Sequence, residues 1–169
     1  MNSLDPINRT VNGEFHYDRL VTSIPWPEWR TWGVLPPEVE TAVDQLVHTA
    51  VDVDYLPENK ITAAHWTYEP SEEVSYHRLL FRHNFCRGAR GCWTETNALR
   101  SGLAGDFRHR NEYAYPVNTL GKPEAMRVIN CWAAKHGIIP LGRWGAWEHM
   151  NSDVAVELAL KTAETVCHA

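Results

Sequence analysis

The first third of the chain shows a hydrophobic pattern typical of short strands followed by a helix. Residues 9–16 place an Asn-Gly pair between two short alternating runs, which predicts a tight β-hairpin. The apolar run over 20–24 predicts a strand that stops at the prolines after it. Apolar residues then recur at helical spacing, with two prolines at the start, so we predict a helix over 36–47.

The middle of the chain is dominated by alternating apolar and polar positions. Four segments carry this strand pattern, at 49–55, 64–69, 75–83 and 92–100, and an extended segment follows at 110–117. These segments predict an antiparallel sheet of about five or six strands.

The last third predicts two long helices. Residues 122–136 begin with Pro and Glu in the first turn and end before Gly137, and their apolar positions share one face. Residues 153–166 form the second helix, capped by Asn151, Ser152 or Asp153. Its buried side is expected to carry Val154, Leu158 and Ala159. With the helix at 36–47, the pattern predicts an α+β fold with three main helices, in a single domain over residues 1–169, a usual domain length.

Composition and charge narrow the classes of partner. The net charge is -5 and no run of Lys or Arg occurs, so neither nucleic acid nor an anionic membrane surface is an expected partner. No apolar stretch reaches the roughly 18–20 residues of a membrane span, and the first residues lack the basic and apolar regions of a signal peptide. We therefore expect a cytoplasmic protein.

In the cytoplasm, the four cysteines are expected to be reduced thiols and not disulfides. Five residues separate Cys86 from Cys92, a spacing that matches no common zinc motif, so no metal is expected.

The last third of the chain resembles a known family. Residues 113–164 read YAYPVNTLGKPEAMRVINCWAAKHGIIPLGRWGAWEHMNSDVAVELALKTAE. This text is similar to the C-terminal end of UDP-galactopyranose mutases and of protoporphyrinogen-oxidase-like flavoproteins of the amine-oxidase type. The matching positions are Tyr115, Pro116, Val117, Thr119, Leu120, Gly142, Arg143, Gly145, Trp147, Asn151 and Asp153. The segments 16–25, 65–70 and 76–85 also resemble family strands, and the resemblance is weakest over 86–110.

The resemblance implies the substrate-binding part and C-terminal helix of an FAD-dependent protein, without its nucleotide-binding half. No Gly-x-Gly-x-x-Gly motif with the required spacing occurs in the sequence, so no cofactor is expected. If FAD were bound, the family pattern would place Arg143 at its phosphates and Asn151, at the start of the last helix, near the flavin ring. Two departures bear on that role: Trp144 replaces a family Phe, and Val154 replaces a family His.

Two predicted strands supply candidate acid/base groups. Strict alternation over 75–83 puts Tyr76, Arg78, Leu80 and Arg82 on one face, and His77, Leu79, Phe81 and His83 on the other. His77 and His83 would then share a face and could exchange protons near neutral pH, or they could be ordinary half-exposed histidines. Glu95 shares a face with Trp93 and Asn97, where burial would raise its pKa, although a surface Glu is the alternative. Arg78 matches a recurrent Arg of the resembling family.

The segment before the last helix is the densest polar and aromatic cluster of the chain. It contains Arg143, Trp144, Trp147, Glu148 and His149, followed by Asp153. His149 and Asp153 are further acid/base candidates. Packing left over from a flavoprotein ancestor is the alternative interpretation.

Three functions are compatible with these patterns. The first is a flavin-independent isomerase, cyclase or lyase that acts on a small apolar or polycyclic molecule by acid/base and positioning catalysis. Its catalytic groups would be His77, His83, Glu95, His149 and Asp153. Its substrate-binding groups would be Trp66, Tyr68, Arg78, Trp93, Tyr115, Arg143, Trp144 and Trp147. The second is a subunit of a split FAD-dependent oxidoreductase or mutase, and the third is a non-catalytic ligand-binding protein. In each case a homodimer or a partner chain is expected to cover the face that the missing half would have covered.

Overall fold

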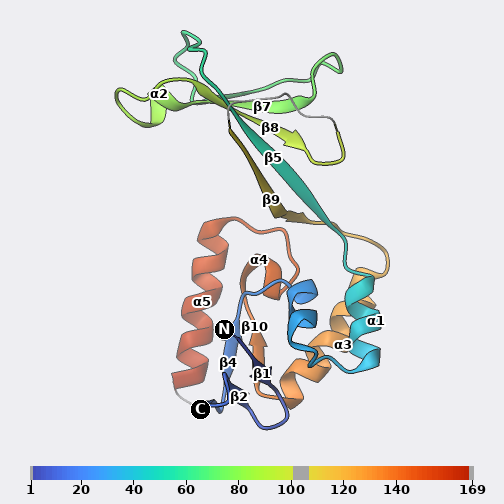
Figure 1. Ribbon diagram of the computed structural model, residues 1–169. Coiled ribbons are helices and arrows are strands. Elements are labelled where there is room, and N and C mark those ends of the chain that lie inside the picture. Colours follow the sequence, from blue (N-terminus) through green and yellow to red (C-terminus); the bar gives the residue numbers. More distant parts are fainter. Residues whose placement is uncertain (1, 101–106, 168–169) are drawn as a thin grey trace. The chain divides into compact units, whose positions relative to one another are not determined.

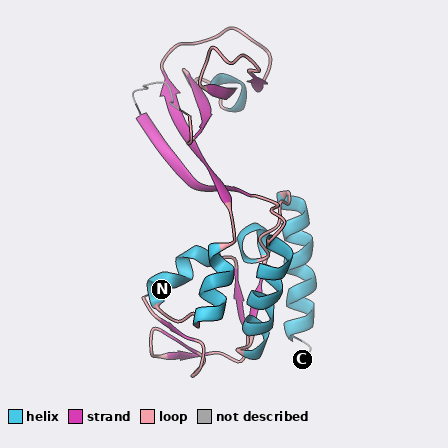
Figure 2. Ribbon diagram, turned by 90° about the vertical axis from the view of Figure 1, so that its right-hand side faces the viewer, coloured by secondary structure: helices cyan, strands magenta, loops and turns pink. Residues whose placement is uncertain are grey.

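The structure is a computed structural model that describes residues 2–100 and 107–167, and the chain forms two compact units. The first unit combines residues 1–47 and 116–169, and the second is His48–Tyr115. The first unit carries the long helices, and the second is built mainly of strands (Figure 1, Figure 2). The observed fold is α+β, as predicted, and the assignment of a single domain stays a prediction.

The first unit begins with a three-stranded antiparallel sheet. Its strands are β1 (Leu4–Asp5), β2 (Thr10–Val11) and β3 (Phe15–His16), in that order. The backbone φ angles of Asn12 and Gly13 are +55° and +70°, a conformation that Asn and Gly adopt more easily than other residues. The predicted hairpin is therefore confirmed.

A second, smaller sheet in this unit joins distant segments of the chain. β4 (Leu20–Thr22) runs parallel to β10 (Ile138–Pro140), so the predicted strand at 20–24 is confirmed. β4 is followed by the 3-10 helix η1 (Trp26–Trp32), which brings Trp26 and Trp29 into the core.

Helices supply most of the core of the first unit. They are α1 (Pro37–Asp44), α3 (Lys122–Lys135), the short α4 (Gly142–Gly145) and α5 (Ser152–Cys167). The core contains fully buried Trp26, Trp29 and Trp147, and it also contains Val39 from α1 and Ile129 from α3. The predicted helices at 36–47, 122–136 and 153–166 are confirmed, with ends shifted by a few residues at most.

The predicted buried side of α5 is confirmed at Ala159, which is partly covered, and wrong at Val154 and Leu158. None of its described residues is buried, and the side chains of Val154 and Leu158 are 40% and 37% exposed. The partly covered positions are Ala155, Ala159, Thr162 and Val166, which recur at helical spacing. The larger aliphatic side chains of α5 lie on its exposed side.

The second unit is a five-stranded antiparallel sheet, as the sequence pattern predicted. Its strands are β5 (His48–Leu56), β6 (Trp66–Tyr68), β7 (Tyr76–Phe81), β8 (Cys92–Asn97) and β9 (Phe107–Pro116). Their order across the sheet is β6-β7-β8-β5-β9, so β5 and β8 lie near its middle. The short helix α2 (Arg82–Phe85) follows β7 directly.

The two faces of this sheet differ in character. On one face Thr94, Thr96, Asp52 and Asp54 are buried, together with apolar Leu79. The opposite side, here called the open face, is defined by the paired positions Trp66, Tyr68, Arg78, Leu80, Trp93, Glu95 and Asn97. The predicted alternation over 92–100 is confirmed, because Thr94 and Thr96 are on the face opposite Trp93 and Glu95.

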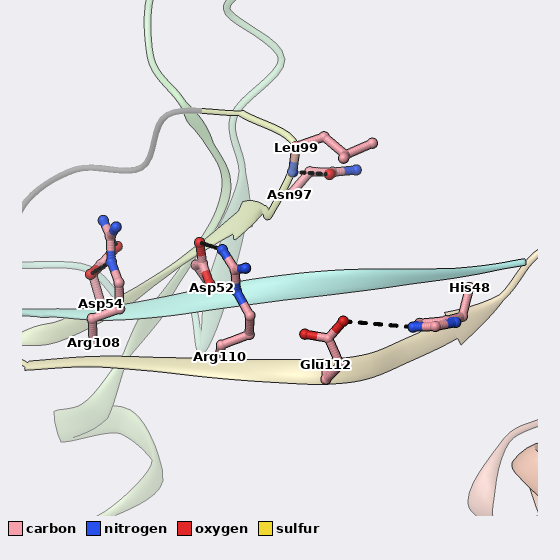
Figure 3. Close-up of polar contacts among 8 residues, drawn as sticks. All are labelled: His48, Asp52, Asp54, Asn97, Leu99, Arg108, Arg110 and Glu112. Atoms are coloured by element: carbon pink, nitrogen blue, oxygen red, sulfur yellow. Dashed lines mark hydrogen bonds and ion pairs between the residues drawn. The ribbon is translucent and has the colours of Figure 1, made fainter. Parts of the chain in front are cut away.

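Ion pairs hold β9 to β5 on the buried face. Arg110 donates from Nε and Nη2 to the two carboxylate oxygens of Asp52, at 2.8 and 2.9 Å, and Arg108 holds Asp54 in the same way (Figure 3). Further along the same two strands, His48 Nε2 lies 3.8 Å from Glu112 Oε1. The hydrogen bonds from Arg110 keep the pKa of Asp52 below its usual value, although burial opposes them.

A β-bulge in β7 overturns part of the predicted alternation. Tyr76 pairs with Thr96, but Arg78 pairs with Glu95, the adjacent residue of β8, so His77 is an extra residue. Tyr76 therefore packs against the buried face with Leu79 and Phe81, and it does not share the face of Arg78. The placement of Arg82 and His83 on strand faces is also wrong, since both belong to α2.

In the part of the chain that the structure describes, no helix is long and apolar enough to cross a bilayer.

Candidate functional site

Three charged or titratable side chains meet at the centre of the open face. Arg78 Nε donates to Glu95 Oε2 at 2.8 Å, and Arg78 Nη2 contacts the same oxygen. His77 Nε2 lies 3.9 Å from that oxygen as well. The bulge therefore turns His77 toward Glu95, and a carboxylate sits between a permanent cation and an imidazole.

The side chains of Arg78, Glu95 and His77 differ in their exposure to solvent. The side chain of Glu95 is 16% exposed, whereas that of His77 is 43% exposed. Partial burial opposes the charge of Arg78, but the hydrogen bond and charge of Glu95 and a hydrogen bond with Tyr68 raise its pKa above the ordinary value. Arg78 therefore stays a cation that holds Glu95, and the imidazole is the member of the trio that solvent or a ligand reaches.

A hollow of about 500 Å³ adjoins His77 on the open face. Its lining, here called the polar hollow, consists of Thr49, Val51, Ser75, His77, Asn97, Arg100 and Tyr115. This volume is in the range of small-molecule sites. Most of these side chains carry a hydrogen-bonding group, which can orient the polar atoms of a ligand.

The other histidine predicted to act with His77 lies elsewhere. His83, on α2, has Nε2 3.3 Å from the carbonyl of Thr62 and lines a separate small hollow with Ala89. The prediction that His77 and His83 share a face is wrong, because the bulge at His77 and the start of α2 both interrupt the alternation.

The predicted aromatic residues of the second unit lie on or beside the open face. Trp66 pairs with Leu80 and Tyr68 with Arg78, and the Tyr68 ring lies 6.0 Å from the Arg78 guanidinium carbon. Trp93 pairs with Leu80 on the other side of β7, and Tyr115 lines the polar hollow. The structure thus brings Trp66, Tyr68, Arg78, Trp93 and Tyr115 onto one face with His77 and Glu95.

The predicted C-terminal cluster belongs to the first unit and is mainly packing. Trp147 is fully buried in the core, and Trp144 packs against it with ring centroids 5.3 Å apart. Arg143 Nη2 donates to the carbonyl of Met150 at 2.7 Å, whereas His149 and Asp153 are exposed. Because Trp147 is fully buried, its ring packs in the core and does not line an open pocket.

The described residues do not fit a complete FAD. Asp153 adds a negative charge in the first turn of α5, which disfavours a phosphate at that helix start. β9 leads through a loop to the long helix α3, but that loop contains a single glycine, Gly121, and not the Gly-x-Gly-x-x-Gly motif that approaches a pyrophosphate. Arg143 and Asn151 alone could contact only a fragment of the cofactor.

Several residues at the open face were missed by sequence reasoning. Asn97 and Arg100 line the polar hollow, and Arg82 lies against the ring faces of Tyr55 and Trp93. One signal was available: residues 74–94 contain four arginines and two histidines but no Asp or Glu. The charge pattern could have marked this segment as cationic, but it could not have placed Arg82 on the rings.

Comparison with known proteins gives one distant likeness of fold. No protein-family model and no curated protein sequence matches this chain. Among solved structures, reduced UDP-galactopyranose mutase is similar, with a TM-score of 0.62 and 17% sequence identity. The similarity covers 86% of this chain but 40% of the mutase chain, so this chain spans well under half of the structure that it resembles. The likeness supports the predicted fold at the level of architecture.

Proposed function

We propose that this chain is a flavin-independent enzyme that uses His77 as a general acid or base on a small molecule in the polar hollow. The observation that carries this proposal is the position of His77: its ring lines the hollow, and its Nε2 lies 3.9 Å from Glu95 Oε2. A carboxylate behind an imidazole stabilises the imidazolium that forms when the ring accepts a proton, and it orients the ring.

The neighbours of His77 have separate roles in this proposal. Arg78 positions the Glu95 side chain by a hydrogen bond, and Asn97 and Arg100 supply donors for the polar atoms of a ligand. Proton transfer without a redox cofactor serves isomerisation, elimination and some cyclisations. His83, His149 and Asp153 have no part in it, because none of them lines the polar hollow.

Proton transfer can be tested without knowing the substrate. Purified protein is incubated in D₂O with a small-molecule extract of the source cells, and mass spectrometry records which compounds gain deuterium. We expect at least one compound to exchange in a protein-dependent manner, with loss of exchange in His77→Gln and retention in His65→Gln, an exposed histidine of the same unit. Undiminished exchange in His77→Gln would contradict the role of His77, and exchange by neither protein would favour simple binding.

A second candidate function is a subunit of a split FAD-dependent oxidoreductase or mutase. β4 and β10 form a parallel sheet of only two strands, whereas parallel sheets usually have more strands and are covered on both faces. A separate nucleotide-binding chain could extend such a pair. Titration of the purified protein with FAD distinguishes the two candidates: tight binding of FAD by this chain alone, or a yellow protein after purification, would remove the flavin-independent proposal.

A further inference from the structure

Another hollow, here called the apolar cleft, lies at the other end of the open face. It has a volume of about 310 Å³ and is lined by Leu80, Arg82, Phe85, Cys86, Ala89 and Trp93. It shares no lining residue with the polar hollow. Arg82 is the one charged residue of this lining.

Aromatic rings hold Arg82 in place. Its guanidinium carbon lies 5.3 Å from the ring centroid of Tyr55 and 5.3 Å from that of Trp93. Its Nη1 also donates to the carbonyl of Arg90 at 2.9 Å. These contacts fix the guanidinium at the wall of the cleft, while its other N–H groups keep the capacity to donate.

Within residues 2–100 and 107–167, the Arg82 guanidinium has no carboxylate partner. Arg78, Arg108 and Arg110 each pair with an Asp or Glu across the sheet, but no acidic residue in the described parts of the chain lies within ion-pairing distance of Arg82. The surrounding segment 74–94 contains no acidic residue either. The apolar wall excludes part of the water that would hydrate the Arg82 guanidinium. An anionic ligand group compensates for this lost hydration, so the site favours an anion.

We propose that the apolar cleft binds a small carboxylate with an apolar body, with Arg82 as the anion-binding residue. The guanidinium donates to the carboxylate through two N–H groups, and the body contacts Leu80, Phe85 and Ala89. The cleft volume is at the lower end of the range for small-molecule sites, so the ligand is of the size of one or two fused rings. This site does not depend on the proposed proton transfer at His77.

Calorimetric titration with 2-naphthoate tests this assignment. We expect saturable binding to the unmodified protein and a loss of affinity of about tenfold or more in Arg82→Gln, the usual effect of losing a charged hydrogen bond. Neutral 2-naphthamide and acetate, which lack the charge and the apolar body respectively, should each bind at least about tenfold more weakly. Arg87→Gln, at an exposed arginine of the same segment, should keep full affinity.

The location of the probe needs its own measurement. In a Cys131→Ser/Cys167→Ser background the exposed thiol that reacts first is Cys86, which lines the cleft, because Cys92 is buried. Bound 2-naphthoate should slow alkylation of Cys86, and Ala89→Leu should weaken binding by filling the cleft without changing charge. Arg100→Gln, in the polar hollow, should leave affinity unchanged.

Several outcomes would overturn the assignment. These are the absence of saturable 2-naphthoate binding, equal affinity in Arg82→Gln, equal affinity for 2-naphthamide, or loss of binding in Arg100→Gln instead. None of them depends on turnover, so failure of this proposal and failure of the proposed enzymatic function are separate results.

Discussion

Arg108 holds Asp54 through two hydrogen bonds, from Nε to Oδ1 at 2.8 Å and from Nη2 to Oδ2 at 3.1 Å. The Asp54 side chain is fully buried, whereas the Arg108 side chain is 46% exposed. The two partners therefore differ in their access to water. If the ion pair is broken, water can hydrate the half-exposed Arg108 side chain but not the buried Asp54 carboxylate.

This asymmetry predicts unequal effects of removing the two partners. Arg108→Gln should destabilise the second unit more than Asp54→Asn, because it leaves a buried carboxylate without its cation. We expect Asp54→Asn to lower the free energy of unfolding by about 1–3 kcal/mol. Urea denaturation followed by circular dichroism gives both values, and equal losses would contradict the asymmetry.

The neighbouring pair predicts a pH dependence. Because hydrogen bonds from Arg110 lower the pKa of Asp52 in the folded chain, its stabilising effect is complete above the ordinary Asp pKa of about 4 and is lost as the pH falls through the lowered value. Asp52→Asn should therefore be less stable than the parent near neutral pH, and the difference should shrink in acid. Denaturation curves at a series of pH values test this, and a constant difference down to about pH 2 would refute it.

Two glycines of the turn before β8 form a matched pair. Both have positive φ, +83° at Gly88 and +74° at Gly91, but only at Gly91 would a Cβ meet other atoms, 2.4 Å from the Leu56 carbonyl oxygen and 2.5 Å from the Tyr55 ring. Gly88→Ala should cost only the strain of a left-handed backbone, about 1–2 kcal/mol. Gly91→Ala should cost clearly more, since backbone of β5 must move. Comparable denaturation midpoints for the two variants would argue against this close approach.

In the first unit, Trp26 combines packing with a buried hydrogen bond. Its Nε1 donates to the Gly145 carbonyl at 2.8 Å, and its ring lies 4.9 Å from that of Trp29. Trp26→Phe should lower the free energy of unfolding by about 1–3 kcal/mol, because a buried carbonyl loses its donor. Trp66→Phe, at a half-exposed ring, should change it by no more than about 0.5 kcal/mol. Thermal unfolding of the two variants provides the comparison.

The elements that sequence reasoning found are those that local patterns determine. The Asn-Gly turn requires residues that tolerate positive φ, and the period of two in β8 separates Thr94 from Glu95 without knowledge of the rest of the fold. The helix at 122–136 was likewise predictable, because its buried positions Met126, Ile129 and Ala133 recur at helical spacing.

The errors arise where a neighbouring element decides the outcome. The sequence pattern of residues 75–83 does not indicate the bulge. Regular pairing after Tyr76–Thr96 would place Arg78 opposite Thr94, but Arg78 pairs with Glu95. The covered side of α5 was partly misjudged because the larger Val154 and Leu158 were taken to be buried, whereas the partly covered residues include Ala155 and Ala159. The sequence identified His77, Arg78 and Glu95 as candidate site residues. It could not predict that His77 and Arg78 both approach one oxygen of Glu95, because this arrangement depends on the bulge.

The pairing of β7 with β8 does not depend on His77, the extra residue of the bulge. Thr96 and Glu95 are consecutive in β8, and their partners Tyr76 and Arg78 flank His77. A chain lacking residue 77 would pair those four positions in an unbroken ladder, with Tyr76 still inward and Arg78 still outward. The register of the sheet therefore does not require His77, and a one-residue deletion should remove the imidazole while the pairing of β7 with β8 is kept.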